Sequence, residues 1–165
     1  MIKYAYFAGG CFWCITPVFK IYGALSVTCG YSGGDTDNPT YEEVKHQKTG
    51  HRETICVEYD DEKTKYTRLL EIFLANIDPY DGGGQYIDRG HSYTAAVYYS
   101  TPAEKEAAEE AIKSLEKSSG QKVHVAVEKQ KNFYRAEEYH QDYYLKNPEA
   151  FEKELEESGR KRKKQ

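Results

Sequence analysis

Two consecutive glycines near the start of the chain separate segments of different character. Residues 3–7 are mostly aromatic, which is typical of a β-strand, and a helix is expected from about Cys11 to Tyr22. Gly9 and Gly10 end the strand, because glycine weakens a strand interior and favours a turn. A strand that turns directly into a helix predicts a fold in which strands and helices pack in layers around one core.

The rest of the chain continues this mixture of strands and helices. Four more strands are expected, at residues 25–31, 53–59, 92–99 and 123–128. Five more helices are expected, at residues 40–46, 67–76, 101–118, 136–145 and 149–157. Asn38 before Pro39 fits the N-cap of the first of these, and Thr101 opens a capping box at the third. The prediction is one α/β or α+β domain over residues 1–158, with about five strands and a glycine-rich functional loop at residues 78–85.

Charge and composition narrow the possible function classes. The net charge of −4 argues against nucleic acid as a main partner, and no apolar run approaches the roughly 20 residues of a membrane span. The first residues do not form the pattern of a signal peptide, so a cytoplasmic protein is expected. The protein is also expected to be a monomer. Residues 159–165 include a run of five basic side chains and are expected to be a disordered, solvated tail rather than a binding arm.

Cys11 and Cys14 form a C-x-x-C pair at the predicted helix start. In a cytosolic chain, four cysteines are not expected to form structural disulfides, so a close pair favours reactivity or metal binding. A cysteine at a strand-to-helix junction faces unpaired backbone N–H groups and the positive end of the helix dipole. Both favour the thiolate, so a lowered pKa is expected at Cys11, with Cys14 able to attack it once it is oxidised. The preceding glycines are expected to leave space above the sulfur.

Three interpretations of the cysteine pair compete. Inert buried thiols are disfavoured, because the glycines, the aromatic residues and the spacing coincide. A zinc site, as in a zinc-stabilised interaction module, needs four ligands, and Cys29 and Cys56 are isolated residues that are expected to pack in the core. A redox pair remains, either in a general disulfide oxidoreductase of the thioredoxin type or in an enzyme that acts on a small sulfur compound. The aromatic residues between the cysteines favour the second, since sulfur and methyl groups bind well against aromatic rings.

Reduction of a sulfoxide by a thiolate also requires a proton donor, because oxide is a very poor leaving group. Glu53 lies at the start of a predicted strand, where burial against aromatic residues would raise the pKa of its carboxyl group. Taken alone, Glu53 fits a solvated charge at a strand end better than an acid. Taken as single residues, Tyr41, Tyr93 and Asp88 likewise do not distinguish a catalytic role from an ordinary structural one.

The order and spacing of several short motifs point to one family. The motifs are Gly9-Gly10-Cys11-Phe12-Trp13, Gly30-Tyr31-Ser32-Gly33-Gly34, Asn38-Pro39-Thr40-Tyr41-Glu42-Glu43-Val44, Thr49-Gly50-His51-Arg52-Glu53, Asp78-Pro79, Asp88-Arg89-Gly90-His91-Ser92-Tyr93 and Tyr139-His140-Gln141. Over residues 7–148 the chain resembles peptide methionine sulfoxide reductase A, an enzyme that restores methionine from one of the two sulfoxide epimers. The resemblance implies a two-layer sandwich around a mixed, mostly antiparallel sheet. It also implies action on methionine-S-sulfoxide, whether bound in a peptide or free, without metal or organic cofactor.

The resemblance also implies a role for each matched residue. Cys11 would be the nucleophile, Glu53 the proton donor, and Phe12 and Trp13 the pocket for the methyl group. Tyr41 and Tyr93 would hold the sulfoxide oxygen, and Asp88 would orient the substrate.

The second thiol of the reaction is implied by a departure from the common family pattern. Many members have glycine at position 14 and carry resolving cysteines in the C-terminal tail, whereas this tail has none. Cys14 is therefore expected to be the resolving thiol, as in the subset of the family that reads C-F-W-C. A thioredoxin would then reduce the Cys11–Cys14 disulfide.

Overall fold

The computed structural model describes residues 1–158, so the expected basic tail lies outside the described residues. The strands are β1 Ile2–Gly9, β2 Ser26–Ser32, β3 Arg52–Asp60, β4 Gly84–Gln85, β5 Asp88–Arg89, β6 Ala95–Tyr99, β7 Ala126–Lys129 and β8 Tyr134–Arg135. The α-helices are α1 Phe12–Ile21, α2 Tyr41–Lys45, α3 Tyr66–Ala75, α4 Pro102–Ser119, α5 Tyr143–Lys146 and α6 Pro148–Ser158. Two short 3-10 helices are η1 His91–Tyr93 and η2 Glu138–His140.

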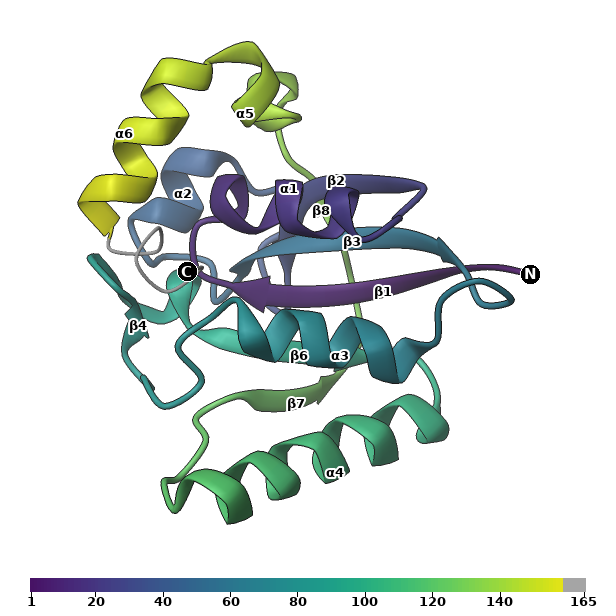
Figure 1. Ribbon diagram of the computed structural model, residues 1–165. Coiled ribbons are helices and arrows are strands. Elements are labelled where there is room, and N and C mark those ends of the chain that lie inside the picture. Colours follow the sequence, from purple (N-terminus) through teal and green to yellow (C-terminus); the bar gives the residue numbers. More distant parts are fainter. Residues whose placement is uncertain (159–165) are drawn as a thin grey trace.

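Six strands form one sheet in the order β7-β6-β1-β3-β2-β8 (Figure 1). Only β6 and β7 pair in parallel within this sheet, as far as residues 1–158 show, so the predicted mixed, mostly antiparallel sheet is confirmed. The expectation of about five strands missed the short edge strand β8 and the separate two-stranded ribbon of β4 and β5. No helix of the described residues is long and apolar enough to cross a bilayer.

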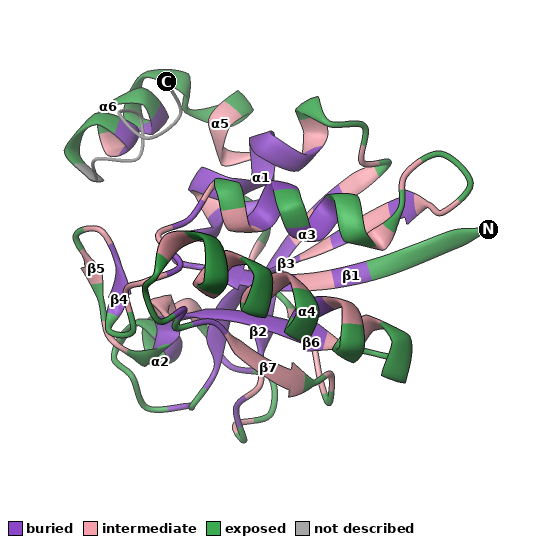
Figure 2. Ribbon diagram, turned by 60° about the horizontal axis from the view of Figure 1, so that its bottom comes forward, coloured by how far each residue is buried: buried purple, intermediate pink, exposed green. Residues whose placement is uncertain are grey.

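One face of the sheet carries the main core, covered by α1, α3 and α4. Phe7 of β1 stacks against Phe19 of α1 and Phe73 of α3, with ring centroids 5.6 and 4.9 Å apart. Ala108 of α4 joins the same core. Figure 2 shows that β1 is exposed in its first half and buried in its second. The buried half of β1 therefore leads directly into the turn that carries Cys11.

The helix starts follow from local capping chemistry. Thr101 caps α4 as predicted, accepting a hydrogen bond from the N–H of Glu104, and the helix stops at Gly120, which is in the left-handed conformation. The predicted capping box is formed only in part, because the carboxylate of Glu104 accepts the N–H of Ser100 at 2.7 Å. The prediction for α2 was wrong by two residues. Thr40, not Asn38, is the N-cap, because Thr40 and Glu43 form a reciprocal capping box.

Two strand predictions began too early. The strand expected at residues 92–99 starts at Ala95, because the side chain of Gln47 accepts the backbone N–H of Ser92 and holds it in η1. The strand expected at residues 123–128 starts at Ala126, because the N–H of Val123 is donated to the carboxylate of Glu116 instead of to β6.

The helix expected at residues 136–145 is also wrong. Ala136 donates its N–H to the carbonyl of Cys29 on β2, at 2.9 Å. The side chain of Gln141 bonds the same residue twice, accepting from its N–H at 2.9 Å and donating to its carbonyl at 3.0 Å. This segment is therefore tied to the edge of the sheet, and only η2 and α5 form within it.

Candidate active site

Cys11 occupies the turn between β1 and α1. Gly10 has φ of +87°, a left-handed conformation that favours glycine. A Cβ added at Gly9 would lie 2.8 Å from the side chain of Ile77, so Gly9 lets β1 pack closely on the segment after α3. The expectation that the glycines leave space above the sulfur was thus wrong at Gly9, where the space is filled by core side chains.

Cys14 lies directly against Cys11. Cys11 is the N-cap of α1, and the N–H of Cys14 donates to its carbonyl at 3.1 Å. The two thiols also hydrogen-bond to each other, and both are buried, with 6 % and 1 % of their surface exposed. All four cysteines are free thiols. The predicted second thiol thus lies in contact with Cys11 at the start of α1.

The expected lowering of the Cys11 pKa is wrong for this closed arrangement. The hydrogen bond with Cys14 raises the pKa of Cys11, burial raises it further, and the carboxyl groups of Glu53 and Asp88 act in the same direction. The helix start does not offset this, because the N–H of Phe12 is already donated to Glu53 rather than turned to the sulfur. In this arrangement the surroundings of Cys11 therefore favour the thiol over the thiolate.

Glu53 is a buried carboxylic acid beside Cys11. It lies opposite Tyr31 in the pairing of β3 with β2, only 1 % of it is exposed, and its Oε1 accepts the N–H of Phe12 at 3.2 Å. Burial raises the pKa of Glu53 to about 8, against a smaller lowering by the Phe12 hydrogen bond. Its other oxygen, Oε2, is buried without a hydrogen-bond partner among the described residues. Such a group is protonated at neutral pH and has one oxygen available for a ligand.

The structure also brings the two predicted tyrosines and Asp88 to this place. The hydroxyl groups of Tyr41 and Tyr93 hydrogen-bond to each other. Burial raises the pKa of both groups, and Glu53 raises both further. Asp88, on β5, is close enough to raise the pKa of Cys11, Glu53 and Tyr93. Two strands, β3 and β5, together with helix α2 and the 3-10 helix η1, therefore converge on the thiol pair.

The aromatic residues after Cys11 have different environments. Phe12 is fully buried and packs against Tyr31, whereas Trp13 is partly exposed. The indole of Trp13 donates to Nδ1 of His140 at 3.0 Å and stacks on Tyr143 with ring centroids 4.0 Å apart. Of the two predicted pocket residues, Trp13 thus presents a surface at the site, and Phe12 supports it from behind.

Sequence reasoning gave no role to several residues of this site. His140 belongs to the motif Tyr139-His140-Gln141, for which no role was predicted. Its ring accepts the hydrogen bond from the indole of Trp13 and packs on Tyr41, with ring centroids 4.4 Å apart. Burial lowers the pKa of His140 to about 4, so the ring is neutral. Glu137 accepts hydrogen bonds from Tyr31 and Tyr41. The motif Tyr139-His140-Gln141 was the signal that could have found this segment.

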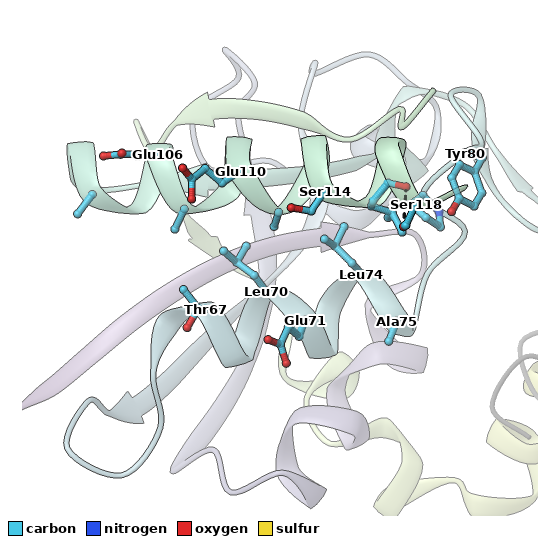
Figure 3. A pocket seen from close by; sticks show the side chains of 15 residues that line it. Thr67, Leu70, Glu71, Leu74, Ala75, Tyr80, Glu106, Glu110, Ser114 and Ser118 are labelled. Carbon is cyan, nitrogen blue, oxygen red and sulfur yellow. Dashed lines mark hydrogen bonds between the residues drawn. The ribbon is translucent and has the colours of Figure 1, made fainter. Parts of the chain in front are cut away.

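The C-terminal helix α6 covers the thiols. Phe151 and Leu155 form one buried cluster with Cys11 and Cys14, and α6 lies beside the start of α1 (Figure 1). A groove of about 960 Å³ lies elsewhere, between α3 and α4, where Leu70 and Leu74 point toward α4 (Figure 3). Cys11 and Cys14 are not among the residues that line that groove.

Loosening α6 should expose the thiols. In Leu155→Ser, the loss of buried apolar surface should make opening of the helix easier, and iodoacetamide should alkylate Cys11 or Cys14 at least ~10-fold faster than in the parent protein. Mass spectrometry of the reduced protein over time measures this rate. Lys153→Ala, an exposed change on the same helix, is the control. Equal rates in Leu155→Ser and the parent would show that α6 is not the barrier.

The two remaining cysteines lie apart from the Cys11–Cys14 pair. Cys29 is buried under α1, with its sulfur 3.3 Å from the hydroxyl oxygen of Thr16, as expected of a core residue. Cys56 is partly exposed and pairs across the sheet with Tyr6, so the expectation of a core position was wrong for it. Within residues 1–158 there is no group of three or more His, Cys, Asp or Glu side chains that could hold a metal ion.

Comparison with known proteins gives a consistent result. The family model for peptide methionine sulfoxide reductase matches residues 3–165. Peptide methionine sulfoxide reductase MsrA 2 of Staphylococcus aureus is 45 % identical over 162 residues, which cover 96 % of this chain and 92 % of the relative. MsrA of Bacillus licheniformis is 47 % identical over 150 residues, covering 89 % and 83 %.

Solved structures of the same kind share the fold. Reduced Mxr1 from Saccharomyces cerevisiae has a TM-score of 0.85 at 28 % identity, over 90 % of this chain and 87 % of Mxr1. Methionine sulfoxide reductase A of Corynebacterium diphtheriae has a TM-score of 0.80 at 28 % identity, over 89 % and 76 %. Because the family model spans nearly all of the sequence and the relatives are this similar, the chain belongs to the peptide methionine sulfoxide reductase family.

Proposed function

We propose that this chain is a peptide-methionine (S)-S-oxide reductase in which Cys11, Glu53 and Cys14 carry out the chemistry. The observation that carries this proposal is the position of Glu53. It is a buried acid with a pKa of about 8, bonded to the N–H of the residue next to Cys11. A nucleophilic thiol and a protonated carboxyl group side by side are the two groups that sulfoxide reduction requires.

The substrate would be held by its oxygen and its methyl group. The sulfoxide oxygen would accept hydrogen bonds from Glu53 and from the hydroxyl groups of Tyr41 and Tyr93. The methyl group would contact Trp13, backed by Phe12. Asp88 would orient the substrate from β5. Met sulfoxide in an oxidised protein or peptide would reach this place after α6 has moved aside.

The reaction would proceed in two steps that balance. Cys11 attacks the sulfoxide sulfur, forming a bond between the two sulfurs, while Glu53 protonates the sulfoxide oxygen. The oxygen then passes as hydroxide from the substrate sulfur to the sulfur of Cys11, and the bond between the two sulfurs breaks with its electron pair on the substrate sulfur, which leaves methionine and a sulfenic acid on Cys11. The sulfoxide is reduced by two electrons and Cys11 is oxidised by two. The thiol of Cys14 then attacks the sulfenic sulfur, forming a Cys11–Cys14 disulfide and releasing one water.

A thioredoxin would reduce that disulfide. Support comes from yeast Mxr1, a protein of the same fold that has been solved in complex with Trx2, at a TM-score of 0.61 and 21 % identity. The C-F-W-C run, with no cysteine in the tail, supports resolution by Cys14. We further propose that residues 1–158 form a single catalytic domain and that the protein is a cytoplasmic monomer without nucleic-acid or membrane partners.

Mass spectrometry of a methionine-S-sulfoxide peptide tests the activity. Incubation with the protein and a thiol reductant should remove one oxygen atom from the peptide, and the R epimer should stay unchanged. A peptide that keeps its oxygen would contradict the proposal. Reduction of insulin disulfides with no action on the sulfoxide would instead identify a general disulfide oxidoreductase.

A further inference from the structure

Glu137 joins three separate parts of the fold. It follows β8 and precedes η2, and its half-buried carboxylate accepts two hydrogen bonds. The hydroxyl of Tyr31, on β2, donates to Oε1 at 2.7 Å. The backbone N–H of Tyr41, the first residue of α2, donates to Oε2 at 2.9 Å. Both carboxylate oxygens are therefore engaged, one with the sheet and one with the helix that carries a tyrosine of the active site.

The bond from Glu137 is independent of the ordinary cap of α2. The capping box satisfies the N–H groups of Thr40 and Glu43 and leaves that of Tyr41 for another acceptor. A helix of five residues has few internal hydrogen bonds to define its position. The link to Tyr31, which is fully buried in the sheet, therefore sets where α2 begins relative to the core.

The position of α2 determines where the phenol of Tyr41 lies. Its hydroxyl meets that of Tyr93, and its ring packs on His140 and lies 6.5 Å from Trp13 between centroids. A hydroxyl group stabilises a developing charge only when it is held within a few tenths of an ångström of its productive place. A shift at the first residue of α2 moves this hydroxyl directly.

We propose that Glu137 is a positioning residue for sulfoxide reduction, which fixes the start of α2 on the sheet so that the Tyr41 hydroxyl meets the sulfoxide oxygen. This inference rests on the proposed role of Tyr41. Glu137 itself touches neither the substrate nor the thiols. The adjacent Glu138 is exposed and pairs with Arg135, so it provides a matched control.

The variants separate a positioning role from the loss of a charge. Glu137→Ala removes both acceptors and should lower kcat/KM for a methionine-S-sulfoxide peptide, measured with dithiothreitol, about tenfold. Glu137→Gln can still accept from the Tyr41 N–H through its oxygen, while its amide donates to the Tyr31 hydroxyl oxygen. It should therefore keep kcat/KM within about threefold of the parent value. Glu138→Gln should leave it unchanged.

A double-mutant cycle with Tyr41→Phe tests whether Glu137 acts through that hydroxyl. Tyr41→Phe should lower kcat/KM, and adding Glu137→Ala should then cost little more, because no hydroxyl remains to be placed. Melting curves identify variants that fail to fold. If Glu137→Ala fails to fold, Glu137→Asp takes its place in the cycle. The shorter aspartate side chain cannot reach the Tyr31 hydroxyl and the Tyr41 N–H at the same time.

The kcat/KM values of these variants decide whether Glu137 acts by positioning Tyr41. An unchanged kcat/KM in Glu137→Ala overturns the proposal, and so does an equal loss with and without the Tyr41 hydroxyl, which would indicate a general structural role. An unchanged kcat/KM in Tyr41→Phe removes the role of Tyr41 and this inference with it. The peptide assay of the parent protein separately decides whether the reductase activity is present.

Discussion

Replacing Glu53 by glutamine should lower the rate of sulfoxide reduction at least ~10²-fold. Glutamine has nearly the same shape and its carbonyl oxygen can still accept the N–H of Phe12, so the change removes the acidic proton and little else. The amide still donates a hydrogen bond to the sulfoxide oxygen but cannot transfer a proton to it. Single-turnover formation of methionine, followed by chromatography of a short peptide, measures the rate without interference from recycling.

The pH dependence of that rate provides a second signature. With a pKa of about 8, Glu53 is protonated at neutral pH and loses its proton as the pH rises above that value. The rate of the parent protein should therefore fall on the alkaline side of about pH 8, and this limb should be absent in Glu53→Gln. Glu58→Gln, at the partly exposed far end of the same strand, should preserve both the rate and the limb. A Glu53→Gln variant with a rate near that of the parent would remove Glu53 from the role of acid.

Glu53→Gln lowers the rate, but it should raise the stability of the folded protein. The folded-state pKa of Glu53 is raised from 4.5, its ordinary value, to about 8, so the folded protein binds the proton more tightly than the unfolded chain. The contribution of Glu53 to the free energy of unfolding is fully present below about pH 4.5 and is lost as the pH rises toward 8. Relative to the parent, Glu53→Gln should gain stability across that interval, on the order of a few kcal/mol at its upper end. Urea unfolding at several pH values measures the difference. The site thus retains an acid that destabilises the folded protein.

What the sequence could predict was mainly local. The strand, glycine turn and helix around Cys11, the spacing of Cys14 and the cap of α4 each depend on a few neighbouring residues, and all are found. Burial of Glu53 was not predictable from its own surroundings, because a glutamate at a strand end is usually solvated. It is buried because β3 lies between β1 and β2, and because the start of α1 lies over it. Only the family resemblance selected it.

Two of the errors arose where distant segments compete with local preference. Residues 136–145 have a helical pattern, but Gln141 and Ala136 bond the edge of β2, and the segment follows the sheet instead. The pKa expected for Cys11 assumed a free helix end, whereas Glu53 takes the N–H of Phe12 and α6 covers the sulfur. Both corrections depend on contacts across more than 40 residues, which periodicity and spacing do not contain.

Replacing Cys14 by serine should abolish thioredoxin-driven turnover while leaving the first reduction intact. Each molecule of Cys14→Ser should form about one methionine and then stop, because a sulfenic acid on Cys11 has no neighbouring thiol with which to condense. Quantifying methionine per enzyme with excess thioredoxin, thioredoxin reductase and NADPH measures this. Trapping with dimedone, followed by mass spectrometry, should locate the sulfenic acid on Cys11.

The structure explains why the other thiols should not substitute for Cys14. The sulfur of Cys29 lies beneath α1, 4.0 Å from the carbonyl oxygen of Phe12, so the helix backbone separates it from Cys11. Cys56 alternates with Ile55 and Val57 along β3 and therefore points away from the face that α1 covers. Cys29→Ser and Cys56→Ser should each sustain turnover, and they serve as controls. Continued turnover in Cys14→Ser that disappears when one of these two is also replaced would assign resolution to that cysteine. In that case α1 or β3 would have to rearrange during catalysis, whereas a disulfide between Cys11 and Cys14 needs only the start of α1 to be uncovered.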